Sequence, residues 1–129
     1  MLEDNATYST TLYTSEAVRM IGHHDRTKGP FFLYAAYQAV HGPLEAPQRY
    51  LDQCGQVTEY MRHIFCGMVL ALDDGVGNIT RALQGSRLLD NTVIALTTDN
   101  VSVITLWDGC GLGALTLGVV YLRRAVKTE

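Results

Sequence analysis

Apolar side chains recur every three or four residues through the middle of the chain. The repeat consists of Met61, Phe65, Met68, Leu72, Val76, Ile79 and Leu83. Such spacing places apolar side chains on one face of an α-helix, so it predicts a long amphipathic helix over residues 59–83. A shorter version of the pattern, with Ala17, Val18 and Ile21 on one side, predicts a second helix over residues 14–24.

Two other segments carry uninterrupted apolar runs without helical spacing. Residues 31–37 form an apolar and aromatic run between the turn Lys28-Gly29-Pro30 and a loop with two prolines. Residues 93–96 form a second, shorter apolar run. Runs of this length between turn residues are typical of strands buried on both faces of a parallel sheet. The order helix, strand, helix, strand therefore predicts an α/β fold with a mostly parallel sheet.

The C-terminal part of the chain contains a third apolar run, over residues 109–122, followed by Arg123-Arg124. A membrane span needs about 20 apolar residues, and this run has fourteen. Extending the run backward includes Asp108, whose charge is costly inside a bilayer. We therefore favour a glycine-rich turn followed by a strand over residues 115–121, with a membrane span as the weaker alternative.

Composition narrows the possible function classes. The 129 residues fit one domain, and 10 basic against 13 acidic residues give a net charge of −3. No basic cluster marks a nucleic-acid surface, so we expect no nucleic-acid partner. The three cysteines, Cys54, Cys66 and Cys110, lack C-x-x-C spacing, so they predict no zinc site and allow at most one internal disulfide. The acidic, polar N-terminal residues do not resemble a secretory signal.

Side chains with reactive or ligand-forming groups follow both predicted strands. Asp99 and Asn100 come directly after the second strand, and their oxygens suit calcium or magnesium at a strand end. The same pair is also ordinary turn chemistry, which is the alternative. His41 follows the first strand, where an imidazole can donate a proton or contact an anion near neutral pH. A purely structural histidine before a Gly-Pro turn is the competing interpretation.

Three further histidines favour ordinary structural positions. His23, His24 and Asp25 are adjacent in sequence, so their side chains diverge on a helix and predict a solvated helix end rather than a metal cluster. His63 falls on the polar side of the long predicted helix. None of the three therefore predicts a metal site.

Two N-x-S/T sequences are candidate glycosylation sites. Asn5 precedes Ala6-Thr7 near the N-terminus, and Asn78 precedes Ile79-Thr80 on the polar side of the long helix. A third match, at Asn100, overlaps the candidate metal ligand, and we interpret it as accidental. The two sites matter only in the secretory pathway.

Several phrases of the chain, taken in order, resemble one known family. They are Tyr8-Ser9-Thr10, KGPFFLYAAYQAVHGPLEAPQRY over residues 28–50, GMVLALDDGVGNITRAL over 67–83, NTVIALTTDN over 91–100, and TLWDG over 105–109. The series resembles the sulfatase family, most closely its arylsulfatase B, I and J group, over roughly residues 8–113. The resemblance implies an alkaline phosphatase-like α/β domain, with residues 1–129 as part of the catalytic domain and residues 101–129 as its divergent C-terminal segment.

By this resemblance the chain is part of a sulfuric ester hydrolase that acts on aryl sulfates or sulfated sugars. Sulfatases use a calcium ion and a formylglycine made from cysteine, which attacks sulfur. The resemblance assigns Asp99 and Asn100 as calcium ligands, and His41 as the residue that contacts the sulfate ester and helps protonate the leaving oxygen. It also implies a lysosomal or secreted protein.

The chain also departs from the family pattern. None of its cysteines lies in the C-x-P-S-R or C-x-A-S-R signature of formylglycine formation, and the early acidic pair of the calcium site is missing. The family's glycine pair and lysine loop after Asn100 are replaced by a short segment, Val101-Ser102-Val103-Ile104. We therefore expect the chain to be inactive alone. The alternative is a non-catalytic, sulfatase-like binding module that associates with a full-length sulfatase.

Overall fold

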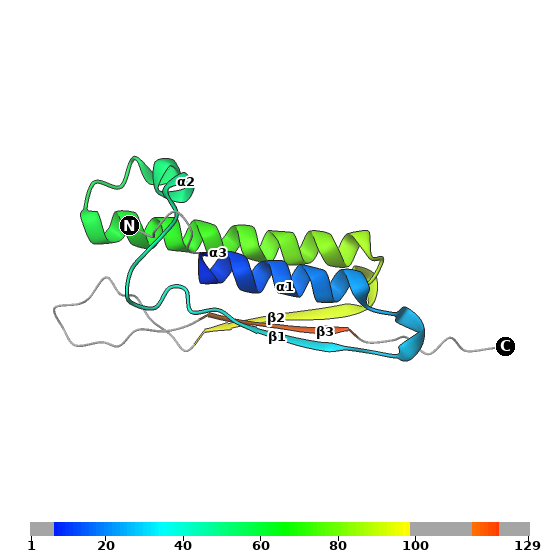
Figure 1. Cartoon of the computed structure of the whole chain (residues 1–129). Helices are drawn as coiled ribbons and strands as arrows, with labels where there is room; N and C mark the ends of the chain where they lie inside the picture. The colour runs from blue at the N-terminus through cyan, green and yellow to red at the C-terminus, as the bar shows by residue number, and fades with distance from the viewer. Residues whose placement is uncertain (1–6, 99–114, 122–129) are drawn as a thin grey trace.

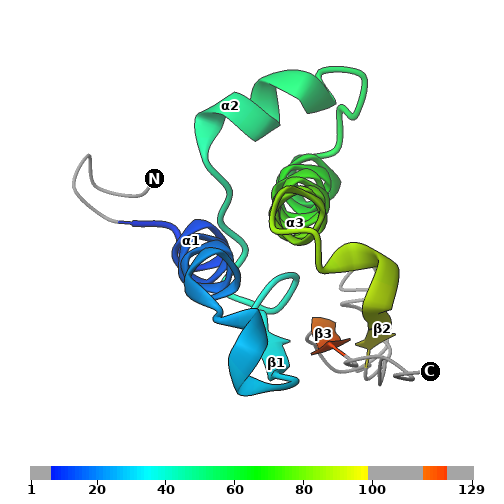
Figure 2. The same cartoon turned by 90° about the vertical axis from the view of Figure 1, so that its right-hand side faces the viewer.

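The computed structural model describes residues 7–98 and 115–121, which form a layer of helices on one face of a small sheet (Figures 1 and 2). The helices are α1 (Ser9–His23), α2 (Gln48–Leu51) and α3 (Tyr60–Gly85), and the strands are β1 (Phe32–Ala36), β2 (Thr92–Thr98) and β3 (Leu115–Tyr121). Three short 3₁₀ segments, η1 (Arg26–Lys28), η2 (Asp52–Cys54) and η3 (Leu89–Asn91), connect them. The predicted α/β class is confirmed.

The strand order is β1-β3-β2, and β3 is antiparallel to both of its neighbours. β1 and β2 therefore run in the same direction, as expected for two strands joined by a helical crossover through α3. They do not pair with each other, because β3 lies between them. The prediction of mostly parallel pairing is thus wrong within the described sheet, since a crossover fixes the direction of two strands but not which strand separates them.

The long helix α3 confirms the prediction from apolar spacing. The Glu59 carboxylate caps its N-terminus by accepting hydrogen bonds from the backbone N–H groups of Met61, at 3.1 Å, and Arg62, at 2.7 Å. At the other end, the backbone N–H of Ser86 donates to the Ala82 carbonyl. The helix thus ends two residues beyond its last predicted apolar position.

Helix α1 begins at Ser9, five residues before the predicted start at residue 14. The buried position in this extra turn and a half is polar, because it is Thr10, and Thr14 at the predicted start is buried as well. The Thr14 hydroxyl donates to the Thr10 carbonyl at 2.7 Å and lies 2.9 Å from the Tyr37 hydroxyl. These bonds satisfy a buried hydroxyl that would otherwise be costly. Gly75 makes room for it, since a Cβ there would lie 2.7 Å from Thr14 Oγ1.

The main core lies between the helical layer and the inner face of β1. It contains Ala17, Ile21, Leu33, Ala35, Tyr37, Leu72, Ile79, Leu83 and Leu88. Helices α1 and α3 lie side by side over this core (Figure 2). The core therefore joins the two segments that carry helical spacing to the first predicted strand.

Strand β1 is buried on one face only, so the prediction of burial on both faces is wrong. Leu33 and Ala35 point inward, with Leu33 8% exposed, whereas Phe32 is 64% and Tyr34 60% exposed. β2 is also exposed, at Val93, Ile94 and Leu96. The apolar run identified the strands correctly, but the described residues provide no second layer over the outer face of the sheet.

β3 confirms the strand expected over Leu115–Tyr121. Among the described residues, no helix combines the length and the apolar character that crossing a membrane requires.

Candidate functional site

His41 lies in the loop that leaves the C-terminal end of β1. Its backbone N–H donates to the Gln38 carbonyl at 2.7 Å, which closes a tight turn. Its Nδ1 lies 2.7 Å from the Gly42 carbonyl oxygen. Because a carbonyl only accepts, Nδ1 carries the proton of this bond, and Nε2 is the nitrogen left to meet a ligand. The loop contains two cis peptide bonds, Ala39–Val40 and Gly42–Pro43.

The His41 side chain is exposed and lines a pocket of about 560 Å³ at the N-terminal end of α1. The other lining residues come from the start of α1, the end of β1, the His41 loop and α3. They are Thr7, Tyr8, Ser9, Ala36, Tyr37, Gln38, Ala39, Gly42, Pro43, Glu45 and Met68. The pocket is open, and the imidazole of His41, the carboxylate of Glu45 and the side chains of Tyr8 and Tyr37 are among the groups that line it.

Tyr8 and Tyr37 form the aromatic part of this pocket. Burial raises the pKa of the Tyr8 phenol above its ordinary value of 10.0, and the charge of Glu45 adds to the shift. Burial also raises the pKa of Tyr37, while its hydrogen bond with Thr14 opposes the shift. Both phenols therefore stay protonated at neutral pH, and the Tyr37 hydroxyl is paired with Thr14 inside the protein.

A small apolar cluster holds the His41 loop against α3. It consists of the buried residues Ala39, Ile64 and Met68, with Val40, Leu44, Ala46 and Leu51 packed against them. Gly67 permits this contact, because a Cβ there would lie 2.8 Å from Leu51 Cδ2 and 3.0 Å from the Ala46 Cβ. The packing of the His41 loop therefore depends on the absence of a side chain at Gly67 of α3.

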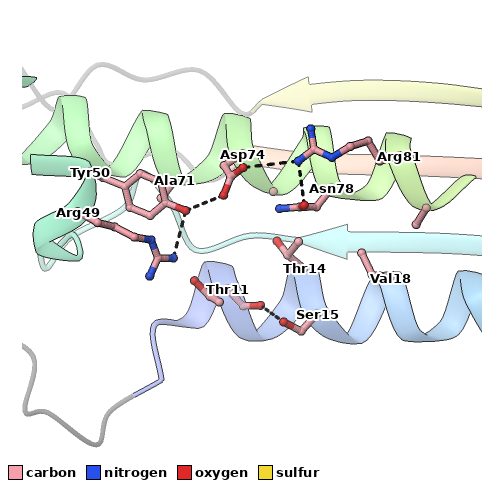
Figure 3. Close-up of a pocket in the computed structure, with 12 residues that line it drawn as sticks. Thr11, Thr14, Ser15, Val18, Arg49, Tyr50, Ala71, Asp74, Asn78 and Arg81 are labelled. Atoms are coloured by element: carbon pink, nitrogen blue, oxygen red, sulfur yellow. Dashed lines mark hydrogen bonds and ion pairs between the residues drawn. The ribbon is translucent and has the colours of Figure 1, made fainter. Parts of the chain in front are cut away.

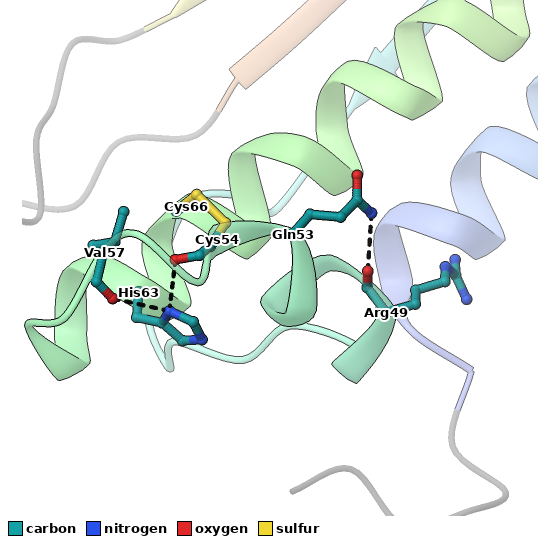
Figure 4. Close-up of a disulfide and its surroundings, with 6 residues drawn as sticks. All are labelled: Arg49, Gln53, Cys54, Val57, His63 and Cys66. Atoms are coloured by element: carbon teal, nitrogen blue, oxygen red, sulfur yellow. Dashed lines mark hydrogen bonds between the residues drawn. A yellow bond between two sulfur atoms is a disulfide. The ribbon is translucent and has the colours of Figure 1, made fainter.

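A disulfide joins the segment after the loop to the same helix. Cys54 in η2 bonds Cys66 in α3, with Cα atoms 6.1 Å apart (Figure 4). His63 lies beside the disulfide, and its Nδ1 is 3.1 Å from the carbonyl oxygens of both Cys54 and Val57. His63 is half-buried, so it acts as a structural bridge as well as a polar surface residue.

The predicted metal ligands Asp99 and Asn100 lie outside the described residues, and so does the candidate glycosylation site Asn5. His23 and His24 diverge as predicted, since His23 Nδ1 bonds the Arg19 carbonyl and His24 Nε2 bonds the Gly29 carbonyl. Within residues 7–98 and 115–121, no group of three or more His, Cys, Asp or Glu side chains could hold a metal ion.

The C-terminal ends of β1 and β2 lie at the same edge of the sheet (Figure 1). The register shows this directly, because Ala36 and Thr97 both face Thr116 of β3. Neighbouring strands are about 4.8 Å apart, so these two strand ends are separated by about 10 Å. The loop with His41 leaves from one end, and the sequence Asp99-Asn100 follows the other.

A family model described as Sulfatase matches residues 2–110. The chain belongs to the sulfatase family. Arylsulfatase J of Mus musculus is 40% identical to this sulfatase over 97 residues, which are 75% of the chain and 16% of that protein. N-acetylgalactosamine-6-sulfatase of Homo sapiens is 36% identical over 93 residues, which are 70% of the chain and 16% of that protein.

A solved structure has the same arrangement of helices and strands. The crystal structure of Ps i-CgsB superposes on this sulfatase with a TM-score of 0.71 and 26% sequence identity, covering 95% of this chain and 30% of that chain. The family resemblance predicted from the ordered phrases is therefore confirmed. The chain spans about one sixth of the length of the two relatives named above.

The pocket beside His41 contains residues that sequence patterns did not single out. Tyr8 belongs to a phrase that supported the resemblance, but nothing in its spacing indicates that it lines a pocket. Glu45 and Met68 reach the pocket only because the loop folds back on α3. The Gly-Pro turn beside His41 indicates that the chain changes direction there, but it does not indicate which element the loop packs against.

Proposed function

We propose that this chain is a segment of the catalytic domain of a sulfuric ester hydrolase, and that His41 contacts the sulfate ester. The main support is the shared edge of the sheet, where the end of β1, which leads into the His41 loop, lies about 10 Å from the end of β2. Open α/β sheets bind ligands at the C-terminal ends of strands that run together. Relatives named arylsulfatase and N-acetylgalactosamine-6-sulfatase support aryl sulfates or sulfated sugars as the substrate class.

In this proposal His41 acts as a general acid. The bond from Nδ1–H to the Gly42 carbonyl orients the ring, so the protonated imidazole donates from Nε2 to the oxygen that leaves sulfur. Asp99 and Asn100 are the proposed calcium ligands, because carboxylate and amide oxygens suit this cation. A bound calcium ion neutralises the sulfate charge. The remaining ligands must come from residues beyond this pair.

The chain alone is proposed to be inactive. Formylglycine forms from a cysteine in a specific signature, and Cys54, Cys66 and Cys110 all lie in other contexts. Cys54 and Cys66 are moreover paired with each other. The nucleophile of the reaction is therefore not supplied by these 129 residues.

We also propose a lysosomal or secreted location, with glycosylation at Asn78 and Asn5. The disulfide supports this location, because stable disulfides form in oxidising compartments and are rare in the cytosol. N-linked glycans are added in the same pathway.

Sulfate titration tests the proposed contact. We expect the His41 imidazole resonances of the purified chain to shift as sodium sulfate is added, and His41→Ala to remove this response. His23→Ala is the matched control, since His23 is exposed on α1 away from the pocket. An unchanged His41 signal would overturn the sulfate contact. Hydrolysis of an aryl sulfate by the chain with calcium, lost in His41→Ala, would instead contradict the proposed inactivity.

The exposed outer face of the sheet supports a second candidate function. Phe32 and Tyr34 are largely exposed on β1, and apolar surface of this kind favours association with another protein. A non-catalytic module that binds a full-length sulfatase would use this face. In a pull-down with a full-length arylsulfatase, Phe32→Ser with Tyr34→Ser would then lower the yield, whereas His41→Ala would not.

A further inference from the structure

A second pocket lies between α1 and α3, on the side of the helical layer away from the sheet. It has a volume of about 590 Å³, and α2 closes one end (Figure 3). We call it the helix groove, and its lining residues are Thr11, Thr14, Ser15, Val18, Arg49, Tyr50, Ala71, Asp74, Gly75, Asn78, Arg81 and Ala82. Its size falls in the range of pockets that hold small ligands, about 300–1,000 Å³.

A continuous chain of polar contacts forms one wall of the helix groove. Arg49 Nη2 donates to the Tyr50 hydroxyl at 3.2 Å, and that hydroxyl donates to Asp74 Oδ2 at 2.9 Å. Asp74 Oδ1 lies 3.7 Å from Arg81 Nη2, which donates to Asn78 Oδ1 at 2.9 Å. Arg49 also stacks 4.6 Å above the Tyr50 ring. These contacts fix the side chains that face the groove.

The opposite wall, from α1, is small and mixed in character. Thr11 and Ser15 present hydroxyls, Val18 presents an apolar surface, and Ala82 of α3 adds to that surface. The groove thus combines hydrogen-bond donors, acceptors and short apolar patches. A sugar ring needs this combination, because its hydroxyl and acetamido groups alternate with apolar C–H faces.

Asn78 lies in this wall with its side chain held in one orientation. A guanidinium only donates, so the atom facing Arg81 must be Oδ1. Nδ2 is therefore the amide atom that does not face Arg81. The next residue, Ile79, is fully buried, so the sequence Asn78-Ile79-Thr80 is anchored on the core side while Asn78 borders the groove.

We infer that the helix groove receives the first N-acetylglucosamine units of an N-linked glycan carried by Asn78. This inference rests on the proposed glycosylation of Asn78. In that reaction Nδ2 bonds to the anomeric carbon of a lipid-linked oligosaccharide and loses a proton, while the lipid pyrophosphate leaves with the electrons of the broken bond. The sugar then lies between Arg49 and Tyr50 on one side and the α1 hydroxyls on the other.

The test uses the chain secreted from eukaryotic cells, both intact and trimmed with an endoglycosidase to a single N-acetylglucosamine. Thr80→Ala removes the acceptor sequence but retains Asn78 and its bond to Arg81. We expect mass spectrometry to find sugar on Asn78, and both glycosylated forms to melt about 4 °C above Thr80→Ala. In spectra of chain carrying ¹³C-labelled sugar, the acetyl methyl should show contacts to Val18 or the Tyr50 ring.

Two comparisons separate glycan binding from the effects of substitution. Unglycosylated wild-type chain and Thr80→Ala, both made in bacteria, measure what the substitution does by itself. Arg49→Ala should remove at least half of the glycan-dependent rise in melting temperature, whereas Arg62→Ala, an exposed arginine of α3 outside the groove, should leave it unchanged.

The outcomes distinguish glycosylation of Asn78 from binding of the attached sugar in the helix groove. Absence of sugar on Asn78 would overturn the glycosylation and, with it, the use of the groove. Sugar on Asn78 without a rise in melting temperature and without contacts to the groove would overturn the groove alone. A rise that survives in Arg49→Ala, with sugar contacts elsewhere, would also contradict it.

Discussion

The helical layer and the sheet differ in how they use the same residue types. Leu83 of α3 is fully buried, whereas Leu96 of β2 is 59% exposed. Ile79 is likewise buried on α3, whereas Ile94 of β2 is 37% exposed. Both segments carry apolar residues, yet within the part of the chain that the structure describes these residues are buried on α3 and exposed on β2.

This difference shows which part of the fold the segment stabilises by itself. Helices α1 and α3 pack against each other and against the inner face of β1, so the main core of buried residues forms within the segment. The outer face of the sheet keeps Phe32 and Tyr34 in solvent. A chain that spans about one sixth of its relatives thus contains a closed core on one side and an apolar surface on the other.

The largest expected effect comes from a matched pair of leucine truncations. Leu83→Ala should lower the free energy of unfolding by about 3 kcal/mol, because it leaves a cavity in the core. Leu96→Ala should change it by about 0.5 kcal/mol or less, because the side chain is already in water. Urea unfolding followed by circular dichroism measures both. Equal losses in the two variants would show that the contrast between the layers is wrong.

Removal of the disulfide should have the next largest effect. The bond closes a loop of sequence separation 12 on the helical side of the molecule. A loop of this length is worth about 3 kcal/mol in the chain-entropy model, and strain or residual structure reduces that value. We therefore expect Cys54→Ser with Cys66→Ser to lose about 2 kcal/mol in urea unfolding. The variant should also be insensitive to dithiothreitol, whereas the parent chain should lose stability when the reductant is added.

The smallest expected effect concerns the cap of α3. The backbone N–H groups of Arg62 and Met61 hold the pKa of Glu59 below its usual 4.5. Because the folded-state pKa is the lower one, the carboxylate stabilises the fold above pH 4.5, and this contribution is lost as pH falls through the folded-state pKa. Glu59→Gln should therefore flatten the dependence of the melting temperature on pH in this acidic range. An unchanged acid profile would contradict the proposed contribution of the cap.

Periodicity located α3 to within two residues at its C-terminal end. The apolar run after the glycine-rich segment located β3 over its full extent. Periodicity missed the first turn of α1, because the buried position there is Thr10. A threonine in a core counts as polar in any hydrophobic pattern, although the hydroxyl of the neighbouring buried threonine, Thr14, is satisfied by the Thr10 carbonyl and Tyr37.

Other features depend on relationships that local sequence does not contain. Three cysteines permit several single pairings, and only the fold brings Cys54 beside Cys66. The position of β3 between β1 and β2 is likewise a long-range choice. The ordered family phrases identified His41. Its neighbours Tyr8 and Glu45 are brought to it only by the packing of the loop against α1 and α3, which local sequence does not predict.

β1 and β2 pair with the same strand, β3, and this affects how the sheet responds to a shift of that strand. Both strands align against the same central strand, where Thr116 faces Ala36 on one side and Thr97 on the other. A slip of β3 by two residues would move it equally past both neighbours and would preserve which face each side chain occupies. The relative alignment of the two strand ends would therefore survive a two-residue shift of β3.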